Sequence, residues 1–589
     1  MNCEIFSDCN CIIIRNFARC NTGHPFIIVL SNETMKPKLP RIFLLLLGIV
    51  FVLNLVQSYF TPLIFDEAYY WHYAQKLSWG YFDHPPLVAL MVRLSGMFFD
   101  GELGVRFMSC ILSSLMFIVL WACIDHPRKK DYVVHFFVLV FSMALLNAYG
   151  FFTLPDTPLL FFTALFLYVY KRFLAKPTWV WGVILGMTMA GLMYSKYHAV
   201  LVIVFVLLSN LKLVTLKNAW LAVIVALACY TPHFIWLYHN DFVTIKYHLF
   251  DRPNDPYSFT KYTLGYFVNL IALFGLTFPW IYWALFKTRQ KDKFTRALLF
   301  LTYGIILFFF MSSFNRRIQT QWIIVITIPL IILVFRQMIE NETLRKWIYR
   351  TGIVNGILIL YLRVGLVYEP ISPIVYETHG NKEWIAEIKS KIGDTPVVFE
   401  NSYRNAPMYA FYAGVPTFSL NNLMYRRNQY SIDESEAKVQ HQKILYVTRR
   451  KQKAPDLELT RADGKVFYGK YIDDFESFRK LRTLVEEPIH LDLEREQEFK
   501  VYNPYDQDID LKKIKFNIAY LTSFKDVKDR MAIEPRIVDD SLKALPANDT
   551  VSFIFKFPKP KMKDPAYFRI GISENGLLPG INGTNTKFD

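Results

Sequence analysis

The sequence predicts a polytopic α-helical membrane protein that ends in a C-terminal soluble α/β domain. Its 589 residues are 53% hydrophobic and 17% aromatic, values that are typical of membrane proteins and high for a soluble chain. Before residue 370 many windows hold the roughly 20 mainly apolar residues that cross a hydrocarbon core, and beyond it none does. Basic residues also recur in alternate loops between these windows, as the topology of a membrane protein requires.

The apolar runs predict eleven membrane spans, whose ends are approximate. They cover residues 41–60, 103–124, 131–150, 155–174, 178–194, 198–216, 219–238, 260–286, 297–313, 318–335 and 347–367. The shorter run 87–99 carries Arg93, so we expect an interfacial or re-entrant helix there rather than a full span.

Charge in the loops sets the expected orientation. With the N-terminus inside, all six cytoplasmic segments are basic, from MKPKLPR at residue 35 to RQMIENETLRKWIYR at residue 336. An odd number of spans then places the C-terminus outside. We expect an integral protein of the bacterial plasma (inner) membrane. Because much of the formal charge of +16 lies in these loops, it reflects topology and not a nucleic-acid partner.

Three regions follow from these patterns. Met35 begins a basic and then apolar stretch that resembles a signal anchor, so residues 1–34 are predicted to be a non-native or disordered N-terminal extension. Residues 35–370 form the transmembrane domain, in which we expect the catalytic groups. Residues 375–589 are more charged and hold strand-length runs such as TPVVFE and VSFIFKF, which predict the extracytoplasmic α/β domain.

The stretch FDEAYYWHYAQKLSWGYFDHPPL, residues 65–87, places titratable groups among aromatic side chains directly after the first span. An aromatic pocket against the membrane makes a carboxylate a better base, so Asp66 and Glu67 are candidate catalytic residues. The alternative for the aromatic residues is an interfacial belt.

The same stretch continues into GYFDHPPL, whose glycine and two prolines predict a rigid turn that holds Asp83 and His84 toward the acid pair. A turn whose polar residues only face water is the other interpretation. The tyrosines around these groups are candidates for substrate binding together with Asp83 and His84: Tyr69, Tyr70 and Tyr81.

Asp156, in LPDTPLLFF, opens a predicted span on the same membrane face. It can cap the helix, or it can act as a second catalytic carboxylate that orients a substrate hydroxyl or a cation. Spacing alone does not separate these two roles.

Basic residues at the outer helix ends run against the charge rule for membrane proteins. Four of them are candidates for binding a lipid-linked phosphate: Arg106, Lys196, Arg316 and Arg317. Contact with lipid headgroups is the alternative for any one of them. The sequence has no Walker loop, dinucleotide fingerprint or HExxH motif. An enzyme on this face therefore needs an activated donor delivered through the membrane, and a polyprenyl-phosphate sugar fits.

The segments FDEAYYW, GYFDHPPLVALMVRL, GELGVRF, LPDTPLLFF, YSKYHAV and NRRIQTQW, in this order, resemble the bacterial branch of family 39 of the GT-C-fold glycosyltransferases. That family includes protein mannosyltransferases and lipid A aminoarabinose transferases. The resemblance implies that Asp66 is the base or orients the acceptor, that Asp156 is the second acid, and that Arg106 and Lys196 contact the donor phosphate. In the aminoarabinose transferases the turn carries Glu and Lys, whereas here Asp83 and His84 replace them.

The resemblance implies inverting transfer of a sugar from a polyprenyl phosphate to a hydroxyl or phosphate on a glycolipid such as lipid A, a polysaccharide or a protein. No cofactor is required, although binding of a divalent cation between Asp66 and Asp156 is a further possibility. A lipid or sugar transporter is the rival from another class, but it would place ionisable groups near mid-membrane, where these spans are mostly apolar. A receptor anchored by eleven spans is a third possibility.

Overall fold

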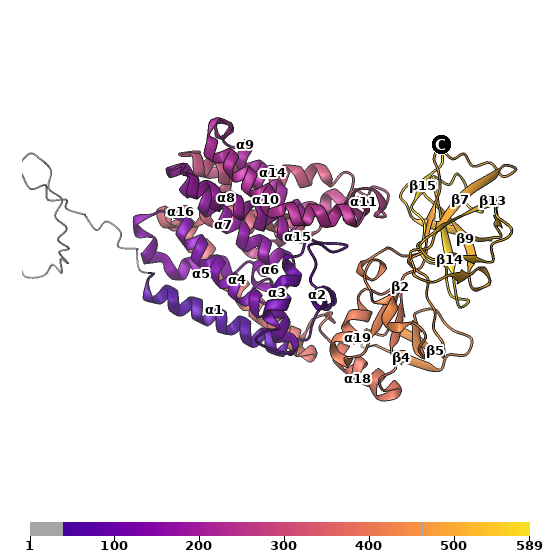
Figure 1. The fold of residues 1–589 in the computed structure, drawn as a ribbon. Coiled ribbons are helices and arrows are strands. Elements are labelled where there is room, and N and C mark those ends of the chain that lie inside the picture. The colour runs from indigo at the N-terminus through magenta and orange to yellow at the C-terminus, as the bar shows by residue number, and fades with distance from the viewer. Residues whose placement is uncertain (1–38, 462) are drawn as a thin grey trace, which may run out of the picture.

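The computed structural model describes residues 39–461 and 463–589, so the predicted N-terminal extension at residues 1–34 lies outside the described residues. A bundle of helices makes up one end of the molecule and a sheet-containing region makes up the other (Figure 1). The bundle comes from residues 41–367, and the sheets come from residues 397–587. The membrane part and the C-terminal sheet region are therefore separate along the chain, as predicted.

Among the described residues, seven helices are long and apolar enough to cross a membrane, or eight if one bent pair counts as a span. The seven are α1 (Arg41–Phe60), α4 (Gly101–Cys123), α7 (Asp156–Ala175), α10 (Lys217–His239), α14 (Lys293–Ser312), α15 with α16 (Thr320–Ile323 and Thr327–Glu340) and α17 (Glu342–Val367). The protein is thus a polytopic membrane protein. The predicted number of eleven spans is not confirmed.

The remaining predicted spans are helical but short or broken. The run at 131–150 divides into α5 (Val133–Phe141) and α6 (Ala144–Ala148), and the run at 260–286 divides into α12 (Gly265–Ala272) and α13 (Phe278–Lys287) with the chain bent by 92°. Gly275 lies in this second break at a φ of +54°, which favours glycine. The helices α8 (Trp179–Ser195) and α9 (Val200–Leu208) are shorter than a full span. Hydropathy averaged over a window does not detect such breaks.

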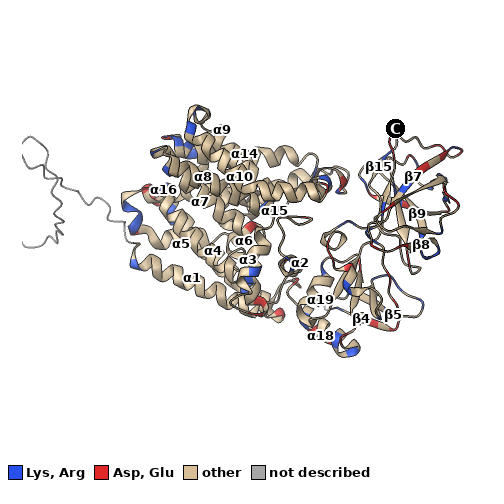
Figure 2. Ribbon diagram, viewed as in Figure 1, with Lys and Arg blue, Asp and Glu red and all other residues tan. Residues whose placement is uncertain are grey.

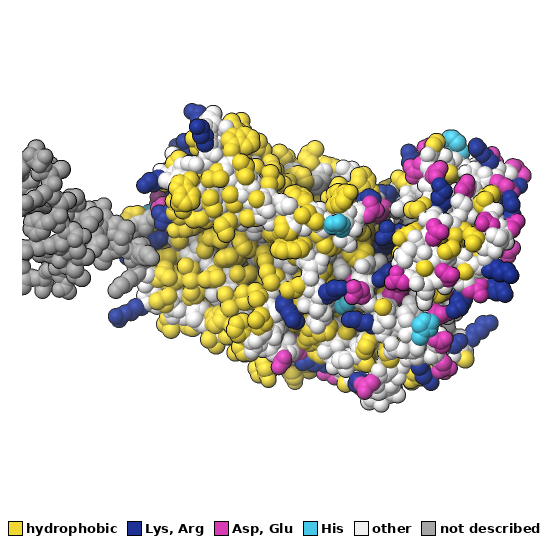
Figure 3. Space-filling model, viewed as in Figure 1, with side chains coloured by type: hydrophobic (Ala, Val, Ile, Leu, Met, Phe, Trp, Pro, Cys, Tyr) yellow, Lys and Arg dark blue, Asp and Glu magenta, His cyan; other side chains and the backbone are white. Residues whose placement is uncertain are grey.

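Side-chain type divides the molecule along its long axis. A broad hydrophobic surface surrounds the helices, whereas charged side chains of both signs cover the sheet-containing region (Figure 3). Lys and Arg also gather at the end of the bundle farthest from the sheets (Figure 2). We call the opposite end, which contacts the sheet-containing region, the domain-facing end.

Two short helices occupy the domain-facing end between α1 and α4. Helix α2 (Phe65–Gln75) begins five residues after α1 ends, and α3 (Leu87–Ser95) follows the turn that contains Asp83. Helix α3 has nine residues, which is too short to span a membrane, in agreement with the prediction for 87–99. Its Arg93 is exposed.

The C-terminal region contains two units with separate cores. The first, which we call the α/β unit, has a five-stranded mixed sheet in the order β2-β1-β3-β5-β4 with parallel pairing of β1 to β2 and β3. Its elements are α18 (Asn381–Ile392), β1 (Val397–Glu400), α19 (Asn405–Ala413), β2 (Thr417–Leu420), β3 (Ile444–Thr448), β4 (Leu457–Thr460) and β5 (Val466–Ile472).

The second, which we call the β unit, has two four-stranded sheets in the orders β10-β9-β14-β15 and β11-β13-β7-β6, with antiparallel pairing. Phe499 and Phe553 of one sheet pack on Phe516 of the other, with ring centroids 5.6 and 5.1 Å apart. The strands are β6 (Arg482–Leu484), β7 (Glu496–Tyr502), β9 (Lys515–Leu521), β10 (Val527–Ile533), β11 (Arg536–Ile537), β13 (Thr550–Lys556), β14 (Tyr567–Ser573) and β15 (Thr586–Lys587), besides the short pair β8 (Ile509–Asp510) and β12 (Ala544–Leu545). The predicted single α/β domain is thus divided in two.

Helix α2 shares its hydrophobic core with the α/β unit. Tyr69 and Tyr73 belong to the same buried cluster as Trp384 and Phe399. The phenol of Tyr412, on α19, also accepts a hydrogen bond from the backbone N–H of Leu63 at 2.9 Å. The loop that follows the first span is therefore held between the bundle and the α/β unit.

Candidate active site

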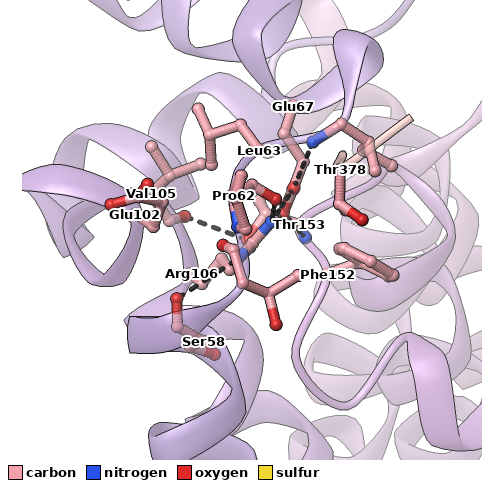
Figure 4. Close-up of polar contacts among 12 residues, drawn as sticks. Ser58, Pro62, Leu63, Glu67, Glu102, Val105, Arg106, Phe152, Thr153 and Thr378 are labelled. Atoms are coloured by element: carbon pink, nitrogen blue, oxygen red, sulfur yellow. Dashed lines mark hydrogen bonds and ion pairs between the residues drawn. The ribbon is translucent and has the colours of Figure 1, made fainter. Parts of the chain in front are cut away.

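Glu67 and Arg106 form a buried ion pair beneath α2 (Figure 4). Both side chains are fully inaccessible to solvent. The guanidinium of Arg106 donates to both carboxylate oxygens of Glu67, one of them at 2.7 Å from Nε, and its remaining N–H groups reach the carbonyl oxygens of Ser58, Thr61 and Pro62. All five donors of this guanidinium are used.

This ion pair corrects two of the predicted roles. Glu67 also accepts hydrogen bonds from the backbone N–H of Thr153 at 2.9 Å and of Ile64 at 3.2 Å. Because Glu67 is buried and fully bonded, it has no access to a substrate proton. Arg106 likewise has no donor left for a phosphate. The pair instead joins α1, α2, α4 and the turn at Thr153.

Asp66, the neighbour of Glu67, is in a different environment. It is partly exposed, and its carboxylate makes no hydrogen bond or ion pair with any residue that the structure describes. Burial raises the pKa of Asp66 to about 6, where Glu377 and Asp83 add to the increase and Arg404 and Arg426 oppose it. The result is an accessible carboxylate that is ionised at neutral pH and is a stronger base than an ordinary aspartate.

Asp156 and Lys196 are brought together at the start of α7. The ammonium of Lys196 donates to both carboxylate oxygens, at 2.8 and 2.9 Å, and both residues are buried. The Asp156 side chain does not cap its helix, so the cap interpretation is wrong. Since Lys196 neutralises this carboxylate, Asp66 has no free second acid with which to bridge a cation. The described residues also contain no cluster of three His, Cys, Asp or Glu side chains suited to a metal ion.

Asp83 anchors the rigid turn that the sequence predicted. It accepts hydrogen bonds from the Tyr69 phenol at 2.9 Å and from Arg426 at 2.7 Å. Burial acts to raise the pKa of Asp83, but the positive charge of Arg426 and its hydrogen bond hold that pKa below its usual value. Asp83 is therefore a fixed anion whose partners lie in two different parts of the chain.

The predicted substrate-binding tyrosines hold this loop together. Tyr69, Tyr70 and Tyr81 are each at most 5% exposed, which leaves little surface for a substrate. The ring of Tyr81 stacks on Tyr73 with centroids 4.2 Å apart. These side chains support the loop, and the structure corrects their prediction as substrate contacts.

His84 is partly exposed and has one unpaired ring nitrogen among the described residues. Its Nδ1 is buried and has no hydrogen-bond partner among the described residues. Burial, with Lys196 nearby, lowers the pKa of His84 to about 3, while Asp83 opposes this change. His84 is therefore neutral at physiological pH, so this turn presents an uncharged imidazole.

Arg316 and Arg317 differ in their surroundings. Arg317 is exposed, whereas Arg316 is partly buried beside Arg252, and neither forms an ion pair with a described acidic residue. Burial and the charge of Arg252 lower the pKa of Arg316. Two neighbouring guanidinium groups without a counter-ion are suited to bind an anion. Arg252, from the long loop after α10, was missed because its loop position gave no specific signal.

Residues of the α/β unit complete the site, and the sequence did not predict them. Arg426 bonds to Asp83, and its guanidinium lies over the Tyr403 ring at 4.4 Å from the centroid. Arg404 and Glu377 contribute to the charge around Asp66 and lie 3.3 Å apart. The basic pair in MYRRNQY was the available signal, but nothing in it pointed to a loop more than 300 residues earlier.

The chain is similar to known proteins in both sequence and fold. The family model described as dolichyl-phosphate-mannose-protein mannosyltransferase matches residues 83–236, which include the Asp83 turn and the Asp156–Lys196 pair. The resemblance to GT-C family 39 is confirmed. A crystal structure of ArnT from Cupriavidus metallidurans in the apo state superposes with a TM-score of 0.51 at 13% identity. It covers 73% of this chain and 97% of its own, and it shows that the fold is GT-C.

One relative by sequence and a second structure of ArnT also match this chain. The lipid A galacturonosyltransferase RgtD of Rhizobium johnstonii is 22% identical over 283 residues. The match covers 44% of this chain and 58% of RgtD, so this GT-C chain spans a little over half the length of that relative. ArnT from Cupriavidus metallidurans bound to undecaprenyl phosphate has a TM-score of 0.48 at 14% identity, with the same coverage as the apo form.

Proposed function

We propose that this protein is an inverting glycosyltransferase that moves a sugar from a polyprenyl-phosphate donor to an acceptor hydroxyl at the domain-facing end. The observation that carries the proposal is Asp66, a carboxylate that is partly exposed, has no bonding partner within the described part of the chain and is raised in pKa to about 6. It lies beside Asp83, Arg404 and Arg426 between the bundle and the α/β unit. The relatives support this chemistry, since RgtD is described as a lipid A galacturonosyltransferase.

In the proposed mechanism Asp66 accepts the proton of the acceptor hydroxyl while its oxygen attacks the anomeric carbon. The bond from that carbon to the donor phosphate oxygen breaks, and the polyprenyl phosphate leaves with the bonding electrons. The leaving phosphate needs positive charge and not a proton. Arg252 and Arg316 can supply this charge, whereas Lys196 is already paired with Asp156. General-base assistance of this kind contributes about 10²- to 10⁴-fold to the rate.

The membrane orientation is part of the proposal. Lys and Arg gather at the end of the bundle away from the sheets (Figure 2), which the positive-inside rule assigns to the cytoplasm. The domain-facing end and the C-terminal units then lie outside the cytoplasm, in a bacterial inner membrane. Acceptors there include a glycolipid such as lipid A, a polysaccharide or a protein.

The transporter alternative would require an ionisable group that serves a substrate path through the bundle. Arg363 of α17 is a buried cation in the membrane part, but its guanidinium bonds to Asn54 at 3.0 Å, Asn147 at 2.9 Å and Gln57 at 3.2 Å. Such a saturated group is suited to joining helices and not to carrying a substrate. The observation does not favour transport.

The substitution Asp66→Asn tests the proposed base, since it keeps the shape and removes the proton acceptor. Membranes that contain the variant and a labelled polyprenyl-phosphate sugar should transfer label to acceptor at least about 100-fold more slowly. Asp100→Asn, at an exposed position on the same end, should transfer normally. An Asp66→Asn protein that folds normally and transfers at the wild-type rate would show that Asp66 is not the base.

A further inference from the structure

A cleft of about 340 Å³ lies beside the proposed site, where three parts of the chain meet. The loop after α10 contributes residues 239–253, the segment after β2 contributes residues 418–432, and the β unit contributes residues near 480–484, 569 and 581–585. The β unit therefore forms one wall of this cleft. Nothing in the proposed mechanism uses it.

The cleft is strongly basic. Some of its cations are already neutralised, since Lys246 pairs with Asp241 at 2.7 Å and Arg479 with Glu574 at 2.9 Å. Four others form no ion pair with any described acidic residue: Arg427, Lys480, Arg482 and Arg569. Asp251 also lines the cleft, and its charge acts on Arg427 and Arg569. One carboxylate does not balance four cations, so the lining carries an excess of positive charge.

Two of these cations are held in place away from bulk water. Arg569 is 7% exposed and donates to Asn585 Oδ1 at 2.6 and 2.9 Å, and Arg427 donates to the carbonyl of Ile581 at 3.2 Å. Burial and the charge of Arg427 lower the pKa of Arg569 to about 10, while Asp251 opposes this change. The Arg569 guanidinium therefore stays charged at neutral pH although it forms no ion pair with a described carboxylate. A buried cation without a counter-ion is costly, and a bound oxyanion would remove that cost.

The cleft is connected to the proposed active site through one residue. Arg426 lines the cleft and also donates to Asp83. Phe82 and Tyr247 line it too, and their rings lie 5.1 Å apart at the Asp83 turn. A molecule that occupies the cleft therefore extends toward the groups around Asp66.

We infer that the cleft is an acceptor subsite. It binds an oxyanionic group of the acceptor, either a phosphate or a carboxylate, that is located at a distance from the attacking hydroxyl. The inference rests on the proposed glycosyl transfer, because that reaction supplies the acceptor. It narrows the acceptor to an anionic glycolipid or glycan. The planar guanidinium groups of Arg427, Arg482 and Arg569 match two oxygens of such a group, and Lys480 adds a point charge.

Binding to the full chain, purified in detergent without donor, tests the subsite. The probes are glucose 1-phosphate, glucuronate and glucose, and the measurement is isothermal titration calorimetry. We expect glucose not to bind and at least one anionic sugar to bind. Binding of glucose 1-phosphate would show that the cleft takes a phosphate, and binding of glucuronate would show that it takes a carboxylate. If neither anionic sugar binds, or if glucose binds equally well, the inference is wrong.

Two double variants test whether the anionic sugar binds in the cleft. Lys480→Ala with Arg482→Ala removes two solvent-accessible cations, so the fold should survive and the dissociation constant should rise about tenfold or more. Arg530→Ala with Lys556→Ala removes two exposed cations elsewhere on the β unit and should leave binding unchanged. An unchanged affinity in the first double variant would place the anion elsewhere and overturn the inference.

The binding measurement separates failure of the subsite from failure of the proposed function. Asp66→Asn should bind the anionic sugar as the wild type does, because Asp66 does not line the cleft. A chain that transfers sugar but binds neither anion refutes the subsite alone. A chain that binds the anion in the cleft but transfers no sugar refutes the proposed function.

Discussion

The pH dependence of transfer tests the environment of Asp66 directly. Its carboxyl has a pKa of about 6, so the ionised fraction is roughly 90% at pH 7 and roughly 10% at pH 5. A general base acts in its deprotonated form. The enzyme should therefore be active above pH 6, where Asp66 is mostly ionised, and should lose activity below pH 6 as Asp66 is protonated. We expect kcat/KM to fall about tenfold between pH 7 and pH 5.

The assay is transfer of labelled sugar from a short-chain polyprenyl phosphate at subsaturating concentrations, because kcat/KM reports the free enzyme. Thermal unfolding at each pH controls for loss of the folded protein. An aspartate with the ordinary pKa of 3.8 would lose only about a twentieth of its ionised form by pH 5. A kcat/KM that is constant from pH 7 to pH 5 in folded enzyme would therefore refute the reasoning.

Two neighbours provide a matched pair of variants for the same profile. The charge of Arg404 lowers the pKa of Asp66 and the charge of Glu377 raises it. Arg404→Gln should move the midpoint of the profile to higher pH, and Glu377→Gln should move it to lower pH. If both variants move it in the same direction, the carboxyl that is titrated is not Asp66.

Two other predictions concern stability and donor binding. Glu67→Gln leaves the buried Arg106 charge without its partner and should lower the free energy of unfolding by about 3–5 kcal/mol, measured by thermal or denaturant unfolding in detergent. The control Glu369→Gln, at an exposed position, should change this free energy little. Equal stability of the two variants would contradict the buried pair. Arg316→Ala should raise the donor KM roughly tenfold and leave the acceptor KM unchanged. The control Arg317→Ala, at an exposed position, should alter neither KM. A change confined to the acceptor KM would assign Arg316 to another role.

Hydropathy predicted the membrane part well because a span is set by local composition. Every predicted span is helical in the structure, and the failures, such as the break between α5 and α6, are interruptions that a window average cannot detect. The segment that carries Asp66 and Asp83 was also identified from sequence, because titratable groups beside a span are unusual.

The roles within that segment could not be predicted. Asp66 and Glu67 are adjacent, and only the rotation of α2 decides that one is accessible and the other buried against Arg106. Asp83 bonds to Arg426, and the charge of Arg404 acts on Asp66, and tertiary contacts bring both arginines from more than 300 residues away. A single sequence has no periodicity that reports such pairing.

The shared core of α2 and the α/β unit has a consequence for biogenesis. Tyr69 packs on Tyr403 with ring centroids 4.9 Å apart, and its buried cluster also contains Trp384 and Phe399; all three are synthesised more than 300 residues later. At roughly 5–20 residues per second, the ribosome needs about 15 to 65 s to produce that partner surface after α2 emerges. The first loop therefore acquires its final shape only when the distal region has been synthesised and has folded. A nascent chain that has inserted only its first spans lacks the packed loop that carries Asp66.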